Sequence, residues 1–284
     1  MRTSFFIIIC SIIFGSCTSV IDVKIPDPDP KIVVEGFIDI GETPYVLLTR
    51  NSPFYDTINA SNLQNYFVSG ATVKMFDGTD TVAFQELTFD TAGVQASIYI
   101  GIGAHGEIGK TYQLFVEADG QQLHASTSIL QPLPLDSVWY TDAPADEPDS
   151  LVQLMVRYSD PPAPGNHVRY FTKRNSESFM PGYNSVFDDA LVNGTTFDFP
   201  LDRGVDRNND STYIDYGYFY RGDTVIVKWS AIDFPHFNFW KTIEFELGGS
   251  GNPFAAPVKI QSNVENGLGI WGGYSSSFDT VIIQ

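Results

Sequence analysis

The stretch "TYQLFVEADGQQLHASTSI" (residues 111–129) decides the fold class of this chain. Apolar and polar residues alternate on both sides of Asp119-Gly120, and this period of two is typical of half-buried strands. An Asp-Gly pair between two alternating runs is a strong signal for a tight hairpin turn. The segment therefore predicts two antiparallel strands joined at residues 119–120.

The same pattern extends over residues 31–131. Short runs rich in β-branched and aromatic residues recur, such as "KIVVEGFIDI" (31–40), and a second hairpin signal stands at Asp77-Gly78. No amphipathic helix of useful length interrupts these runs. About seven strands in a hundred residues predict an antiparallel β-sandwich of immunoglobulin-like or transthyretin-like type, with its topology open.

A change of pattern at "QPLPLD" (131–136) predicts a boundary, because two prolines interrupt the periodicity there. Residues 132–284 then predict a second antiparallel β domain, with a hairpin turn at residues 221–223. Near its end, the motif "NGLGIWGGYSSS" (266–277) predicts a closing strand pair with a glycine-permitted bulge or close backbone approach. We expect Ile270, Trp271 and Tyr274 to pack against this second domain.

One segment of the second domain predicts a short helix, near residues 234–247. Asp233 can cap its first turn, Pro235 is tolerated there, and two glycines at 248–249 end it. Phe237 and Trp240 lie on one stripe of this helix, which we interpret as a face that covers a sheet rather than as a ligand site.

The first seventeen residues, "MRTSFFIIICSIIFGSC", have the form of a bacterial lipoprotein signal. A signal peptide over residues 1–16 would leave Cys17 as the lipidated first residue, followed by a stiff Pro/Asp tether up to residue 30. The alternative is a transmembrane anchor, but the apolar run is shorter than the roughly 20 residues that span a bilayer. We therefore expect a protein held at a membrane by its N-terminal lipid.

Composition limits the classes of partner. The formal charge of −18 becomes −19 once Arg2 leaves with the signal, which argues against nucleic acid and against anionic lipid surfaces. Cys10 would leave with the signal too, so the mature chain would have no disulfide. The four histidines are isolated, and "GAHGEIGKT" (103–111) predicts a hairpin turn rather than a phosphate-binding loop, because a strand follows it.

Two weaker site candidates follow from spacing. Asp206, Asn208 and Asp210 alternate like the oxygen ligands that open a calcium loop, but the turn glycine is missing, and a solvated loop is the better interpretation. No other cofactor is indicated. Tyr216, Tyr218 and Tyr220 share one face of a predicted strand and could hold a glycan or peptide by stacking, but ordinary strand packing is the preferred interpretation.

A family resemblance can be stated on segments that occur in one order along the chain. They are the cysteine at position 17, "KIVVEGFID" (31–39), "VSGATVKMFDG" (68–78), "GKTYQLFVEADG" (109–120), "PLPLDSVW" (132–139) and "NPFAAPVKIQSNVENGLGIWGGYS" (252–275). Together they resemble the Bacteroidota lipoproteins classified as domain of unknown function 4249. The resemblance implies an outer-membrane lipoprotein, often encoded beside a TonB-dependent receptor, and supplies no catalytic or binding residues.

Three functions are therefore considered. The first is a non-enzymatic accessory or ligand-binding partner of a TonB-dependent transporter in nutrient uptake. Such a protein would lie on the periplasmic side of the outer membrane or on the cell surface, and we favour the cell surface. The second is a surface hydrolase of glycans or peptides, whose paired carboxylates would be distant in sequence. The third is a structural or adhesive surface protein.

Overall fold

The computed structural model describes residues 30–52, 57–59, 61–91, 93–206, 217–249, 256 and 258–284. Strands account for 52% of the described residues and helix for 9%, and most strand pairs are antiparallel, so the prediction of a mainly β protein with sandwich-like units is confirmed. None of the helices in the described ranges is both long and apolar enough to cross a membrane.

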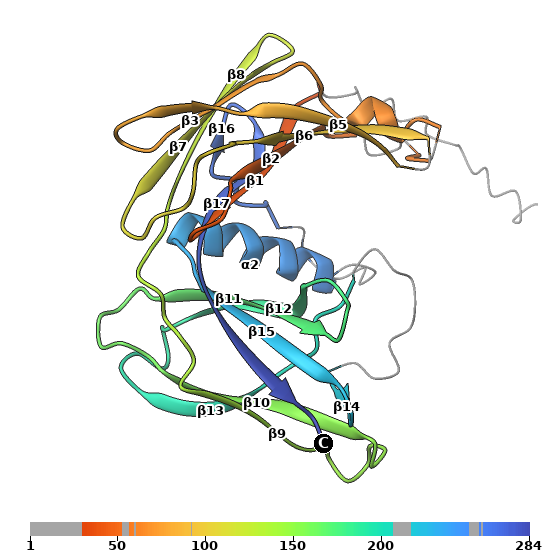
Figure 1. Ribbon diagram of the computed structural model, residues 1–284, viewed down its shortest axis with the longest axis vertical. Coiled ribbons are helices and arrows are strands. Elements are labelled where there is room, and N and C mark those ends of the chain that lie inside the picture. Colours follow the sequence, from red (N-terminus) through yellow and green to blue (C-terminus); the bar gives the residue numbers. More distant parts are fainter. Residues whose placement is uncertain are drawn as a thin grey trace, which may run out of the picture.

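One eight-stranded sheet runs through both halves of the molecule (Figure 1). Across the sheet its strands are β12 (Met180–Asp188), β11 (His167–Arg174), β15 (Thr224–Ala231), β17 (Leu268–Ile282), β1 (Ile32–Asp39), β2 (Tyr45–Arg50), β6 (Val94–Ile100) and β5 (Gln85–Thr91).

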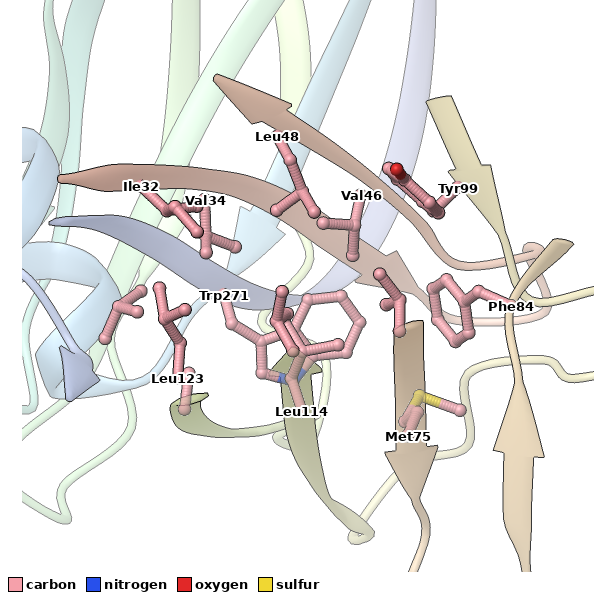
Figure 2. Packing of buried hydrophobic residues seen from close by; sticks show 14 of the residues in the cluster. Ile32, Val34, Val46, Leu48, Met75, Phe84, Tyr99, Leu114, Leu123 and Trp271 are labelled. Carbon is pink, nitrogen blue, oxygen red and sulfur yellow. The ribbon is translucent and has the colours of Figure 1, made fainter. Parts of the chain in front are cut away.

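A five-stranded sheet packs against one end of this shared sheet and completes the N-terminal sandwich. Its strands are β16 (Val264–Glu265), β8 (Gln121–Ser128), β7 (Thr111–Ala118), β3 (Thr72–Phe76) and β4 (Thr81–Ala83). The apolar side chains of the two sheets meet in one buried cluster, in which Leu114 and Leu123 face Val34 and Leu48 (Figure 2). A 3-10 helix, η1 (Leu63–Tyr66), lies between β2 and β3 in sequence.

A smaller sheet packs against the other end and completes the C-terminal sandwich. It contains β13 (Thr196–Leu201), β10 (Leu151–Ser159), β14 (Phe219–Tyr220) and β9 (Ser137–Asp142). Its core combines Val152, Leu154 and Val156 of β10 with Val227 and Trp229 of the shared sheet. The molecule therefore has two separate apolar cores joined by continuous strands.

Strand β17 connects the two sandwiches. Its residues Leu268–Tyr274 pair with β1 in parallel, and its residues 275–282 pair with β15 in antiparallel orientation. Figure 1 shows this strand running from the N-terminal sandwich down to the C-terminus. Thus β16 and the first half of β17, which lie far beyond the predicted boundary at residue 131, belong to the N-terminal sandwich.

The prediction that Trp271 packs against the second domain is wrong. Trp271 is fully buried in the N-terminal core, where its indole N–H donates to the carbonyl of Tyr112 at 3.0 Å (Figure 2). Gly36 on β1 makes room for the ring, since a Cβ there would lie 2.8 Å from it. The parallel register with β1 was not predicted, and it carries this part of β17 into the first sandwich.

The predicted glycine-permitted approach is confirmed at Gly269. This residue has a φ of +104°, and a Cβ there would lie 1.9 Å from the carbonyl oxygen of Val34. Only a residue without a side chain can bring β17 this close to β1 in that conformation.

Local turn signals succeeded where both strands lie in one sheet. Asp119 and Gly120 have φ values of 50° and 71° and join β7 to β8, as predicted, and Asp77-Gly78 lies between the paired strands β3 and β4. The hairpin predicted at residues 221–223 is wrong: β14 pairs with β10, whereas β15 pairs with β11 and β17. That turn therefore carries the chain from one sheet to the other.

Helix α2 (Phe234–Gly249) confirms the predicted helix and its cap. One carboxylate oxygen of Asp233 accepts a hydrogen bond from the backbone N–H of His236 at 3.0 Å. The other oxygen accepts hydrogen bonds from the Thr127 hydroxyl and the Ser128 backbone N–H of β8. The cap thus also ties the helix to the N-terminal sandwich. Figure 1 shows the helix between the two sandwiches, where it packs beside β11, β12 and β17.

A substitution at Gly269 tests the approach of β17 to β1. We expect Gly269→Ala to lower the free energy of unfolding by at least about 2 kcal/mol, because alanine is strained at this φ and would clash with the Val34 carbonyl. Urea unfolding followed by circular dichroism measures the change. Gly248→Ala is the matched control, because a Cβ there meets nothing within 4 Å; equal effects of the two variants would contradict the assignment.

Candidate ligand-binding cleft

A cleft of about 810 Å³ opens beside α2, where the two sandwiches meet. One wall comes from the N-terminal sandwich and the other from the C-terminal sandwich, with the helix along one side. Its lining residues are Glu35, Phe37, Asp39, Glu42, Thr43, Tyr45, Arg169, Phe171, Phe179, Pro181, Lys228, Trp240, Ile243, Leu247 and Tyr274.

Strand alternation brings these side chains to one face. On β1, Ile32, Val34 and Ile38 belong to the N-terminal core, so Glu35, Phe37 and Asp39 project from the opposite face, into the cleft. The strand register then sets the neighbours of these side chains. Tyr45 of β2 is opposite Phe37, and Tyr274 of β17 is paired with Asp39. Further along the sheet, Phe171 of β11 is opposite Lys228 of β15.

Arg169 forms a fixed part of the cleft floor. Only 3% of this residue is exposed, and its guanidinium donates to the Tyr274 hydroxyl at 2.7 Å and to the Ser185 hydroxyl at 3.2 Å. The guanidinium carbon lies 3.5 Å from the centre of the Trp240 ring, a close cation–π contact. Burial raises the pKa of Tyr274 to about 12, so its hydroxyl stays protonated.

Asp39 is also committed to partners within the protein. Its carboxylate lies 2.7 Å from the Lys228 ammonium and accepts the Ser276 hydroxyl at 2.6 Å, while its second oxygen accepts the backbone N–H of Ile40 at 2.8 Å. The Lys228 ammonium further lies 5.0 Å from the Tyr274 ring centre. This ion pair bridges the two sandwiches.

Glu35 differs from Asp39. Within the part of the chain that the structure describes, its carboxylate has no hydrogen-bond or ion-pair partner. The side chain of Glu35 is exposed, but desolvation by the protein around its carboxylate still raises its pKa, while the Arg169 charge opposes the rise. Burial likewise raises the pKa of the neighbouring Tyr45, with Glu35 and Asp39 adding to the effect.

His236 supports the cleft from behind. It is fully buried, its ring lies 6.1 Å from Phe37 and 4.6 Å from Tyr274, and its Nδ1 lies 3.2 Å from the Gly273 carbonyl oxygen. Burial, followed by the Arg169 charge, lowers the pKa of His236 to about 3. The imidazole is therefore neutral at physiological pH, and Nδ1 carries the proton that the carbonyl accepts.

A second cavity, of about 320 Å³, lies in the C-terminal sandwich beside Trp229. Most of its lining is apolar, with Phe187, Phe197 and Phe199 among the rings around it. It is smaller than the cleft and holds no cationic side chain, whereas the cleft brings both signs of charge to its aromatic walls. The cleft is therefore the better candidate for a specific ligand.

Three of the site residues predicted from spacing lie in the described part of the chain, and none of them lines the cleft: Asp206, which is half-buried, Tyr218 and Tyr220. Tyr218 is half-buried before β14, Tyr220 is 38% exposed on β14, and Tyr216 lies outside the described residues. Asn208 and Asp210 of the calcium candidate lie outside them too, as does Cys17. Among the described residues, no three His, Cys, Asp or Glu side chains are grouped to hold a metal ion.

Two kinds of cleft residue were missed. Glu35 and Asp39 stand two positions either side of Phe37 on one face of "KIVVEGFIDI", and acids on that face are a readable signal of a polar surface. On α2, Phe237 is buried as predicted, but Trp240, Ile243 and Leu247 of the same stripe line the cleft. Sequence alone gave no sign that this stripe faces the acids of β1.

Fold and site together define the class of protein: two β-sandwiches that share one sheet, with a charged, aromatic cleft at their junction. The sequence profile of the family described as "Domain of unknown function (DUF4249)" matches residues 18–279. The chain belongs to this family, which confirms the resemblance seen in the sequence. No curated protein matches the chain.

The buried His236 predicts a pH dependence of stability. Because its pKa is near 6.5 in the unfolded chain and about 3 in the fold, only the unfolded state takes up this proton between those values. The neutral His236 therefore makes its full contribution to the free energy of unfolding above pH 6.5. Below that pH the free energy of unfolding falls by up to about 1.4 kcal/mol per pH unit.

Urea unfolding between pH 7 and pH 4 measures this effect. We expect His236→Gln to be less stable than the wild type at pH 7 but to lose stability less steeply on acidification. His105→Gln, which removes an exposed histidine, is the matched control and should keep the wild-type slope. A wild-type slope in the His236 variant would refute the assignment of a neutral buried imidazole.

Proposed function

We propose that this protein is a lipid-anchored, non-enzymatic binding protein of the outer membrane, which serves a TonB-dependent transporter as an accessory in nutrient uptake. The observation that carries the proposal is the cleft between the sandwiches. A cavity of this size, with aromatic walls and a few converging charged groups, is typical of small-molecule, glycan or peptide sites.

Features outside the cleft support the rest of the proposal. The cysteine at position 17, the small residues before it and the Pro/Asp segment after it fit a lipidated N-terminus with a stiff tether. The outer-membrane location and the transporter partner rest on the resemblance to Bacteroidota lipoproteins. Display on the cell surface is favoured over the periplasmic side, because a partner that captures nutrients must meet them before transport.

A surface hydrolase is the second candidate, because Glu35 and Asp39 share one face of β1 and the pKa of Glu35 is raised, as in a general acid. The partners of Asp39 argue against it: Lys228, Ser276 and Ile40 already occupy both carboxylate oxygens. Release of reducing sugar or of peptide fragments by the wild type, lost in Glu35→Gln, would favour the hydrolase instead.

A purely structural or adhesive surface protein is the third candidate. It differs from a binding protein in its response to soluble ligands, since only a ligand that binds the folded state raises the melting temperature. A screen of glycan and peptide mixtures by thermal unfolding therefore separates the two. A rise that disappears in Tyr45→Ala, which removes a part-exposed ring from the cleft wall, would support the cleft as the binding site.

The transporter partnership predicts a stable complex in the membrane. We expect the tagged full-length protein, extracted from outer membranes in mild detergent, to co-purify with a TonB-dependent receptor that mass spectrometry identifies. Cys17→Ala should remove the lipid and shift the protein to the soluble fraction. A wild-type protein that elutes without any receptor, under conditions that preserve other receptor complexes, would count against the transporter role.

A further inference from the structure

We infer that the cleft takes an organic cation, an ammonium or guanidinium group attached to an apolar or aromatic body, with its positive charge beside Glu35 and its body against Phe37 and Tyr45. The inference deepens the proposed function and rests on it, because it names the chemical class of the ligand that the cleft would bind.

The distribution of charge in the cleft is the first reason. On the wall formed by the C-terminal sandwich, both cations are engaged: Lys228 pairs with Asp39, and Arg169 donates to Tyr274 and Ser185. On the opposite wall, Glu35 has no hydrogen-bond or ion-pair partner among the described residues, although the Arg169 charge acts on it through space, and Glu42 lies at the exposed rim. The uncompensated charge in the cleft is therefore negative.

The use of the aromatic rings is the second reason. Internal cations already occupy the rings of the C-terminal side: Arg169 lies over Trp240 and Phe171, and Lys228 lies over Phe171 and Tyr274. Within the described contacts no cation covers Phe37 or Tyr45, whose ring centres lie 5.9 Å apart in an edge arrangement. Tyr45 is 41% exposed, so part of its ring is open to a ligand.

These two features coincide on neighbouring strands. Glu35 and Phe37 project from the same face of β1, and Tyr45 stands opposite Phe37 on β2. Phe37 already packs against His236 and Trp240, so the open ring is that of Tyr45. A carboxylate beside this ring attracts a cation by both Coulomb and cation–π interactions. An anionic ligand would instead face Glu35 directly and would need to draw Lys228 away from Asp39.

Three probes of the same shape test the class of ligand: benzylammonium, benzyl alcohol and benzoate. Saturation-transfer NMR and calorimetric titration at pH 7 measure their affinities for the full chain without its signal. We expect benzylammonium to bind about 10-fold more tightly than benzyl alcohol, which corresponds to about 1.4 kcal/mol, and benzoate to bind most weakly.

Charge-matched variants locate the effect. Glu35→Gln should weaken benzylammonium binding to the level of benzyl alcohol and leave benzyl alcohol itself unchanged. Glu117→Gln removes the same charge from β7, whose Glu117 does not line the cleft, and should leave all three affinities at wild-type values. Circular dichroism melting verifies that both variants are folded.

The outcomes separate the inference from the proposed function. Equal binding of benzylammonium and benzyl alcohol, tighter binding of benzoate, or no loss in Glu35→Gln would overturn the cation class while the cleft remained a binding site. Binding of none of the probes would overturn it as well. Failure of the receptor to co-purify would instead remove the transporter role and leave the ligand chemistry standing.

Discussion

The parallel pairing of β1 with the first half of β17 is the constraint on which the rest of the structure depends. It places a strand from the C-terminal part of the chain beside the first strand, β1. It also inserts Trp271 into the N-terminal core, where the ring packs against Gly36, which has no side chain. Because β17 then continues beside β15, the same strand fixes the C-terminal sandwich relative to the first. The cleft exists only because one strand belongs to both units, since its two walls come from different sandwiches.

The cleft is held by contacts that cross this junction. Asp39 of β1 pairs with Lys228 of β15, and Arg169 of β11 reaches Tyr274 of β17. Each contact is charge-assisted and partly or fully buried. Breaking the first would leave a charge without its counter-ion, and breaking the second would take a hydrogen-bond acceptor from the buried guanidinium. Asp233 adds a third link, because it caps α2 and also accepts two bonds from β8. The walls are therefore positioned by side chains as well as by backbone pairing.

Prediction from sequence succeeded where the information is local. Asp119-Gly120 specifies its own turn, and Asp233 specifies the start of its helix, because each acts through atoms a few residues away. It failed where the partner is distant: the side chain of Trp271 looks the same in either core, and the residues around 221–223 signal a turn without saying which strands follow it. The cleft has the same limit. Alternation on β1 places its acids on one face, but only the sheet order brings Arg169 and Lys228 to them.

Glu35 is an acid of the cleft that the fold leaves without a hydrogen bond in the described structure. Its side chain is exposed, and desolvation by the protein around it raises its pKa. The fold satisfies the neighbouring acid, Asp39, through three donors, so the geometry of β1 does not prevent compensation. Local conflicts of this kind concentrate at functional sites, where a ligand supplies the missing partner. The buried His236 differs from Glu35 by its position: its neutral ring does not line the cleft, donates from Nδ1 to the Gly273 carbonyl and packs between aromatic rings, and so belongs to the support of the cleft rather than to its chemistry.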